Sequence, residues 1–117
     1  MEKIFDAEYK LLEILWDHGS LNSTWLVALC GEKLDWNKST TYTVLRKLKQ
    51  KGAVRHEDAM VTPLLSREAA IREQGEELAR KAGGWFPFLT AFMSGRRLTE
   101  EEAEALKRLI DEKMGEG

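Results

Sequence analysis

The residues best suited to binding chemistry lie between Asn37 and His56. This stretch carries six cations and no acid, although the whole chain has a formal net charge of -2 at pH 7. The cations are Lys38, Arg46, Lys47, Lys49, Lys51 and Arg55. A solvated helix face usually carries both positive and negative charges, because Glu and Lys at four-residue spacing stabilise each other. The pattern indicates a surface for an anionic partner; a solvated helix that merely lacks acids is the alternative.

Hydroxyl side chains precede most of the long cations along the same stretch. Small hydroxyls near the start of a helix can approach base edges, and long Arg and Lys side chains further on can reach phosphates. A helix that lies in the major groove of DNA needs this division of roles. The candidate DNA-binding residues of this region are Lys38, Ser39, Thr40, Tyr42, Thr43, Arg46, Lys47, Lys49 and Arg55.

A single helix of about four turns is expected to position these side chains. Asn37 is a favourable N-cap, and Gly52 is a typical left-handed residue just past a helix end. At 100° per residue, one side of this helix is apolar and the other is polar and cationic. The residues predicted to face the core are Thr41, Val44, Leu45 and Leu48.

Two further helices are expected before this one. Asp6 is the predicted cap of the first, which is densely apolar and ends at Gly19. The second is expected to open at Leu21 and Asn22, with a core stripe formed by Trp25, Leu26, Leu29 and Cys30. Its first turn contains Asn22, Ser23 and Thr24, which could hold a phosphate oxygen or simply cap the helix; both interpretations fit.

The periodicity changes from helical toward two residues after Gly52. Residues 53–57 and 60–64 flank Asp58 and Ala59, which predicts a small β-hairpin. Pro63 cannot donate a hydrogen bond to a neighbouring strand, so its strand is expected at the edge of the sheet. Three helices followed by a hairpin predict a winged helix-turn-helix in a mostly helical protein, with the DNA-binding domain at residues 1–66.

The remaining part, residues 67–117, is predicted to be a helical dimerisation region. It contains a helix that is capped by Ser66 and runs to about Ala82, an aromatic cluster, and a last helix that begins with a Thr99 and Glu102 capping box. These segments have too little chain to bury their apolar faces alone, so a second copy is expected to cover them. The candidate dimerisation residues are Leu78, Trp85, Phe86, Phe88, Leu89, Phe92, Leu106, Leu109 and Ile110.

Other classes of protein find little support in the sequence. Cys30 is the only cysteine, and its place on an apolar stripe favours packing. We find no nucleophile with a base, no glycine-rich phosphate loop and no metal-ligand set, so neither an enzyme nor a bound cofactor is expected. No bilayer-length apolar run or signal pattern is present, and we expect a soluble, cytoplasmic protein. A winged-helix module that binds an acidic protein is the alternative to a DNA-binding repressor.

The chain resembles the penicillinase-repressor family of winged-helix repressors along essentially its full length. The resemblance is carried by DAEYKLLEILWDHGSLN at the start, W-x4-T-x2-V-L-R-x-L-x2-K-G-A-V through the basic helix, TPLLSREAA after the hairpin, and FLTAF followed by RRLTEEEAEALKRLIDE. It implies a homodimer that binds double-stranded, two-fold-symmetric operator DNA and pairs through its C-terminal helices.

The resemblance also implies a route of induction. Members of the family release DNA when a membrane sensor protease pathway cuts them near the aromatic stretch, at an Asn-Phe step. The corresponding step here is Ala91-Phe92, which is the candidate cleavage region and indicates a different inducer. The predicted wing is short and has Glu57 and Asp58 at its tip, where phosphates would be repelled.

Overall fold

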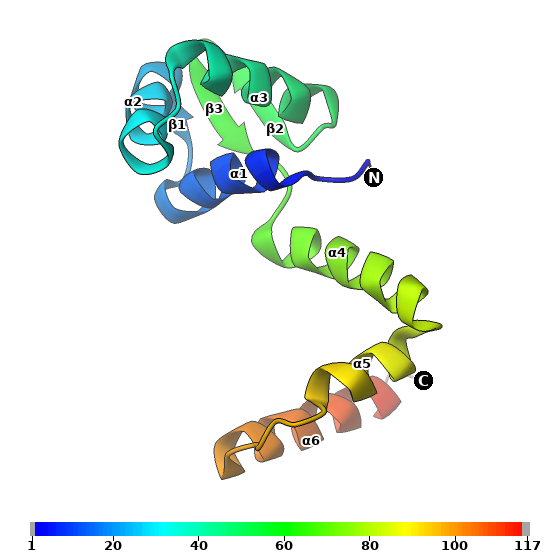
Figure 1. The fold of residues 1–117 in the computed structure, drawn as a ribbon. Helices are drawn as coiled ribbons and strands as arrows, with labels where there is room; N and C mark the ends of the chain where they lie inside the picture. Colours follow the sequence, from blue (N-terminus) through cyan, green and yellow to red (C-terminus); the bar gives the residue numbers. More distant parts are fainter. Residues whose placement is uncertain (1, 116–117) are drawn as a thin grey trace. The chain divides into compact units, whose positions relative to one another are not determined.

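The computed structural model describes residues 2–115, which form six helices and three short strands (Figure 1). The elements in chain order are α1 (Asp6–His18), β1 (Leu21–Asn22), α2 (Ser23–Leu34), α3 (Lys38–Gln50), β2 (Val54–Glu57), β3 (Met60–Pro63), α4 (Arg67–Ala82), α5 (Trp85–Met93) and α6 (Glu100–Gly115). The predicted order of helices and hairpin is confirmed, and the fold is a winged helix-turn-helix followed by helices.

The chain divides into two compact units, Met1–Glu77 and Leu78–Gly117. The first unit contains the three N-terminal helices, the sheet and most of α4. Ala70 of α4 belongs to the core cluster of this unit. A functional boundary at residue 66 stays a prediction, but the compact N-terminal body extends past it.

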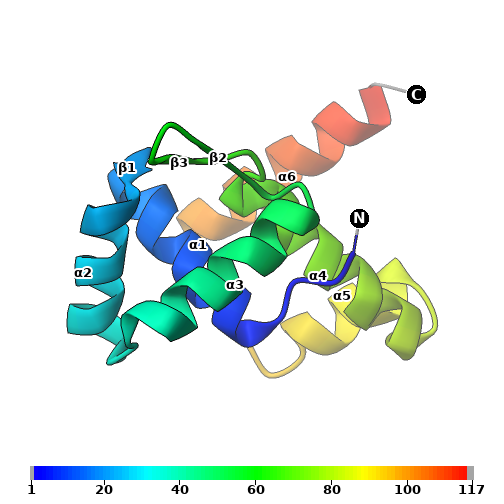
Figure 2. The ribbon, with the colours of Figure 1, turned by 90° about the horizontal axis from the view of Figure 1, so that it is seen from above.

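The core of the first unit lies between α1, α2, α3 and the hairpin (Figures 1 and 2). Its largest fully buried side chains are Leu11, Leu12, Leu15, Leu26, Leu45, Leu48, Val54, Val61, Thr41 and Cys30. The predicted phase of the basic helix is therefore confirmed, because all four residues assigned to its apolar side are buried. Its ends are also as expected, with Asn37 as N-cap and Gly52 at a φ of 76°.

The three strands form an antiparallel sheet in the order β1-β3-β2. The strand that contains Pro63 is the middle one, so its predicted position at an edge was wrong. β1 has only two residues, Leu21 and Asn22, and they pair with Val61 and Met60. Pro63 lies beyond them and pairs only with Val54 of β2. The missing amide of proline is tolerated because β1 is too short to pair with it.

Three local predictions about the first two helices were also wrong. The N-cap of α1 is Phe5 and not Asp6; the Phe5 amide donates to Oε1 of Glu8 at 2.8 Å. Leu21 and Asn22 form β1, so α2 begins later than predicted, at Ser23, although Asn22 does cap it. Trp25 is 66% exposed instead of buried. The buried side of α2 is set by Ser23, Leu26 and Cys30, and Trp25 lies about 100° from Leu26 around the axis.

Cys30 is a packing residue, as predicted. Its side chain is fully buried, and this burial raises the pKa of the thiol above its ordinary value, although a hydrogen bond with Thr41 opposes the shift. A raised pKa disfavours the thiolate, which is the reactive form. Among residues 2–115, no helix is long and apolar enough to cross a bilayer.

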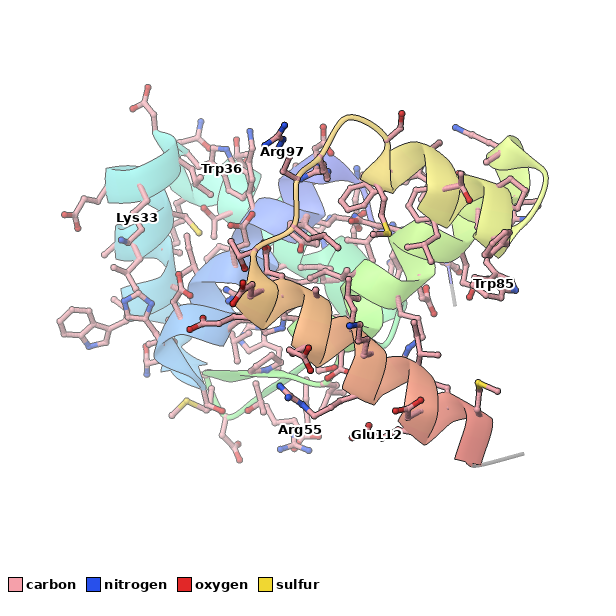
Figure 3. All side chains as sticks on the ribbon, turned by 90° about the horizontal axis from the view of Figure 1, so that it is seen from below. Lys33, Trp36, Arg55, Trp85, Arg97 and Glu112 are labelled. Atoms are coloured by element: carbon pink, nitrogen blue, oxygen red, sulfur yellow. The ribbon has the colours of Figure 1, made fainter. Side chains whose placement is uncertain are left out.

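The second unit presents apolar side chains that it does not bury. α5 and α6 contain no buried residue, and Trp85, labelled in Figure 3, projects from the first turn of α5. The predicted capping box is confirmed: the Thr99 amide donates to Glu102 Oε1 at 3.0 Å, and the Glu102 amide donates to Thr99 Oγ1 at 3.1 Å. Hydrogen bonding by Thr99 holds the pKa of Glu102 below its ordinary value.

Candidate nucleic-acid interface

The face of α3 that points away from the core carries the cations and hydroxyls singled out by the sequence. Those that are exposed are Lys38, Ser39, Thr40, Arg46, Lys47 and Lys49, while Tyr42 and Thr43 are half-buried. Figure 2 shows α3 along its length, with α1 and α2 beside it. The structure thus brings these eight candidate residues together on one helix, with the hydroxyls and Lys38 toward its start and the other long cations toward its end.

Hydrogen bonds within α3 define what its first turns can offer to a ligand. The Asn37 side chain accepts from the Thr40 amide at 2.7 Å, which fixes the helix start. Thr43 Oγ1 donates to the Ser39 carbonyl at 2.9 Å. A hydroxyl that donates in this way still has lone pairs free to accept. Thr43 can therefore accept a hydrogen bond from an exocyclic amine of a base, or offer its methyl group to thymine.

A hollow between α3 and β2 gathers further donors. It has a volume of about 180 Å³ and is lined by Tyr42, Leu45, Arg46, Lys49 and His56; it is called the α3–β2 hollow below. His56 was not among the residues predicted for this surface from the sequence. Its position two residues after the buried Val54 was the available signal, because alternate residues of a strand share a face.

Lys51 does not belong to this surface, although it counts toward the cationic run in the sequence. Its Nζ lies 2.6 Å from Glu8 Oε1 and 2.6 Å from the Lys3 carbonyl oxygen. The Lys51 and Glu8 side chains are only 10% and 3% exposed. Lys51 thus ties the end of α3 to the N-terminal segment and to α1.

The start of α2 contributes fewer surface groups than the sequence suggested. The Asn22 side chain accepts from the Thr24 amide at 2.8 Å, so Asn22 is a helix cap. Ser23 is buried, and its amide donates to the Ala59 carbonyl at 2.7 Å. Of the three candidate residues in this turn, Asn22 and Thr24 are exposed. The hydrogen bond between the Ser23 amide and the Ala59 carbonyl also holds the wing tip against α2.

The wing itself is short and acidic at its tip. Asp58 and Ala59 both have positive φ, 51° and 65°, which matches the tight two-residue turns of hairpins. Arg55 lies on the exposed face of β2, and its Nε is 3.9 Å from Glu57 Oε2. Such an exposed pair contributes little to stability, so Arg55 is available to another anion.

The candidate cleavage step, Ala91-Phe92, lies within α5. The Phe92 carbonyl accepts a hydrogen bond from Arg96 Nε at 2.9 Å, and the Arg96 guanidinium lies 4.4 Å from the centroid of the Phe92 ring. Of the candidate dimerisation residues, those exposed are Leu78, Trp85, Phe86, Leu89, Phe92, Leu109 and Ile110, while Phe88 and Leu106 are half-buried.

Comparison with known proteins assigns the chain to a family. The sequence model of the penicillinase repressor family matches residues 4–112. The chain belongs to the penicillinase repressor family. This family consists of transcriptional repressors and not of enzymes, in agreement with the lack of catalytic motifs.

Individual relatives extend over most of the chain. The penicillinase repressor of Bacillus licheniformis is 23% identical over 116 residues, which cover 94% of this chain and 91% of the relative. An uncharacterised 16.5 kDa protein of Latilactobacillus sakei is 27% identical over 119 residues, which cover 95% of this chain and 80% of the relative.

A solved structure matches the N-terminal part of the fold. The solution structure of the DNA-binding domain of the repressor BlaI superposes with a TM-score of 0.53 at 28% identity. The match covers 59% of this chain and 93% of the BlaI domain. A winged helix in this penicillinase-repressor-family protein therefore has an experimentally determined counterpart.

Proposed function

We propose that this protein is a DNA-binding transcriptional repressor that binds a two-fold-symmetric operator as a homodimer. The observation that carries the proposal is the exposed face of α3, which is free of acids and belongs to a winged helix. The similarity to the BlaI domain, described as DNA-binding, supports the same function. As a soluble repressor, it acts in the cytoplasm.

The residues of α3 divide into two roles in this proposal. Ser39, Thr40 and Thr43 contact base edges in the major groove, where donor and acceptor patterns distinguish all four base pairs. Arg46 and Lys47 reach both bases and the backbone. The backbone contacts are completed by Lys38, Tyr42, Lys49, Arg55, Asn22 and Thr24; Ser23 supports the turn from inside.

The second unit supplies the dimer interface. Trp85, Phe86, Phe92, Leu109 and Ile110 are between 49% and 67% exposed. A cluster of this kind on a monomer marks an interaction surface. A two-fold axis through it would present two α3 helices to half-sites separated by one or two turns of DNA, at about 34 Å per turn.

Loss of the dimer is the proposed route of induction. Cleavage near Ala91-Phe92, by a sensor protease pathway, would separate α6 from the DNA-binding unit. Because the step lies inside α5 and the Ala91 carbonyl accepts a hydrogen bond from the Ser94 amide at 3.2 Å, cleavage requires local opening of that helix. A half-site held by one subunit is bound weakly, so operator occupancy would fall when dimerisation is lost.

Selection from random duplex DNA tests the proposal directly. The full-length protein should enrich a sequence with two-fold symmetry and sediment as a dimer at micromolar concentration. A matched pair of variants separates the functions: Ile110→Asp should yield monomers that lose most operator affinity, whereas Asp111→Asn, at the neighbouring exposed position, should change neither property. A monomeric wild-type protein, or enrichment of sequences without symmetry, would contradict the homodimer.

A second candidate function is an interaction module for an acidic protein. The exposed, acid-free face of α3 is compatible with it, because a basic helix face can bind carboxylates as well as phosphates, and the acidic wing tip, with exposed Glu57 and Asp58, would not hold a DNA backbone. A module of this kind would enrich no DNA sequence in the same selection. Its residual DNA binding would show the salt dependence of non-specific binding alone.

A further inference from the structure

The α3–β2 hollow lies on the proposed DNA-binding side of the winged helix and has an unusual lining for a surface depression. Arg46 and Lys49 come from α3, and His56 comes from β2. Tyr42 adds a phenol, Leu45 forms the apolar floor, and none of the five lining residues is acidic. The hollow thus combines two permanent cations, a titratable imidazole and a hydroxyl around one opening.

The spacing of the α3 residues explains why they meet. Tyr42, Arg46 and Lys49 are four and three residues apart, so they follow one line along the helix. His56 is on the face of β2 that carries Val54, toward α3, and its partner across the hairpin is the non-ionisable Val61. Within the described part of the chain, no hydrogen bond to the His56 ring is present.

We infer that the α3–β2 hollow receives a phosphate group of the DNA backbone and that protonated His56 is one of its cationic ligands. This inference rests on the proposed function and adds a pH-dependent contact to it. The volume of about 180 Å³ is ample for a phosphate oxygen with its hydration, since a cavity needs only about 10–15 Å³ to admit a water. The location beside Arg46 and Lys49 places the contact at the C-terminal half of α3.

The charges around His56 favour an anion when the ring is protonated. Arg46 and Lys49 face the same opening and repel an imidazolium while no anion is present. The nearby charges of β2, Arg55 and Glu57, lie on the opposite face and pair with each other at 3.9 Å. A phosphate in the hollow offsets the repulsion, so binding of DNA and binding of a proton reinforce each other. An imidazole changes charge between about pH 5 and 8, which puts the effect in an accessible range.

Operator affinity measured at about pH 5.5 and about pH 8, over a series of chloride concentrations, tests the inference. The wild type should bind about tenfold more tightly per half-site at the lower pH, as expected for one charge-assisted hydrogen bond. The slope of log operator affinity against log chloride concentration should be steeper at the lower pH by about 0.9 per half-site, because one more phosphate is neutralised. His56→Gln should lose both responses, and His56→Arg should show the steep slope at both pH values.

The chain offers a matched control, because His18 is its only other histidine and lies at the end of α1. His18→Gln should retain both responses, and thermal melting should show that all three variants are folded. A pH response that survives in His56→Gln, or a salt slope that is independent of pH in the wild type, would overturn the inference. Absence of any operator preference at both pH values would instead refute the proposed function.

Inorganic phosphate distinguishes the backbone from a free ion as the source of the bound group. Inorganic phosphate alone, without DNA, should leave the proton NMR signals of the His56 ring unchanged at about pH 5.5, whereas operator DNA should shift them. If inorganic phosphate shifts these signals as much as the operator does, the hollow is a site for the free anion, and the assignment to the DNA backbone is wrong.

Discussion

Replacement of Lys51 by methionine should destabilise the protein far more than replacement of a neighbouring surface lysine. Lys51 Nζ is 2.6 Å from Glu8 Oε1, and the two side chains are 10% and 3% exposed. The ammonium also lies 4.5 Å from the centroid of the Phe5 ring, a favourable cation–π distance. Lys51→Met leaves the Glu8 carboxylate buried without its cation.

The magnitude follows from what Glu8 retains in the variant. Removal of one partner of a buried pair typically costs about 3–5 kcal/mol. Glu8 Oε1 still accepts from the Phe5 amide, and the carboxylate lies in the first turn of α1, where the helix dipole stabilises it. Its other oxygen, Oε2, has no partner in the described residues even in the wild type. We therefore expect about 3 kcal/mol, the lower end of that range.

Urea denaturation of three variants measures this effect. Lys49→Met, on the exposed side of α3, is the matched control and should change the free energy of unfolding by less than about 0.5 kcal/mol. The double variant Glu8→Met/Lys51→Met should recover most of the loss, because a buried ion pair and an apolar pair of similar size are often comparable in stability. If Lys51→Met is no worse than Lys49→Met, or if the double variant is no better than Lys51→Met, the reasoning is refuted.

Two further predictions concern packing and capping. Leu48→Ala should lower the free energy of unfolding by about 2–5 kcal/mol, because Leu48 is fully buried on α3; a change within about 0.5 kcal/mol in thermal melting would contradict its burial. Hydrogen bonding by Thr99 lowers the pKa of Glu102 in the folded state, so its stabilisation of α6 is present above the ordinary carboxyl pKa and is lost as pH falls through the folded value. Acid titration followed by circular dichroism should therefore show a smaller loss of helicity in Glu102→Gln than in Glu101→Gln, and equal losses would argue against the capping box.

The features predicted well from the sequence are those that depend on local spacing. The basic helix is bounded by an N-cap and a glycine, and its apolar residues recur at helical intervals, so its phase and limits were both correct. The capping box of α6 and the two-residue turn at Asp58 are local in the same sense. Such signals depend on residues that are close in the sequence, so they can be recognised without knowledge of the tertiary structure.

The features missed by sequence reasoning depend on distant partners. Lys51 and Glu8 are 43 residues apart, and nothing in the local pattern distinguishes Lys51 from the exposed Lys49. Trp25 is an aromatic residue of a type often found in cores, but the side of α2 that packs against α1 and α3 is the side that carries Leu26 and Cys30. β1 is two residues long, which is too short for periodicity to reveal it, and its pairing moves β3 to the middle of the sheet.

The central claim is that α3 reads DNA sequence with its hydroxyls and holds the backbone with its cations. The most direct test is the ratio of operator affinity to random-DNA affinity in Thr43→Ala and Lys49→Ala. Thr43→Ala should lower the free energy of discrimination that corresponds to this ratio by about 1–3 kcal/mol per half-site, with the loss confined to one base pair. Lys49→Ala should weaken both kinds of binding equally and lower the salt slope by about one per subunit. An equal loss on both DNAs for Thr43→Ala, or an unchanged affinity for both variants, would contradict the claim.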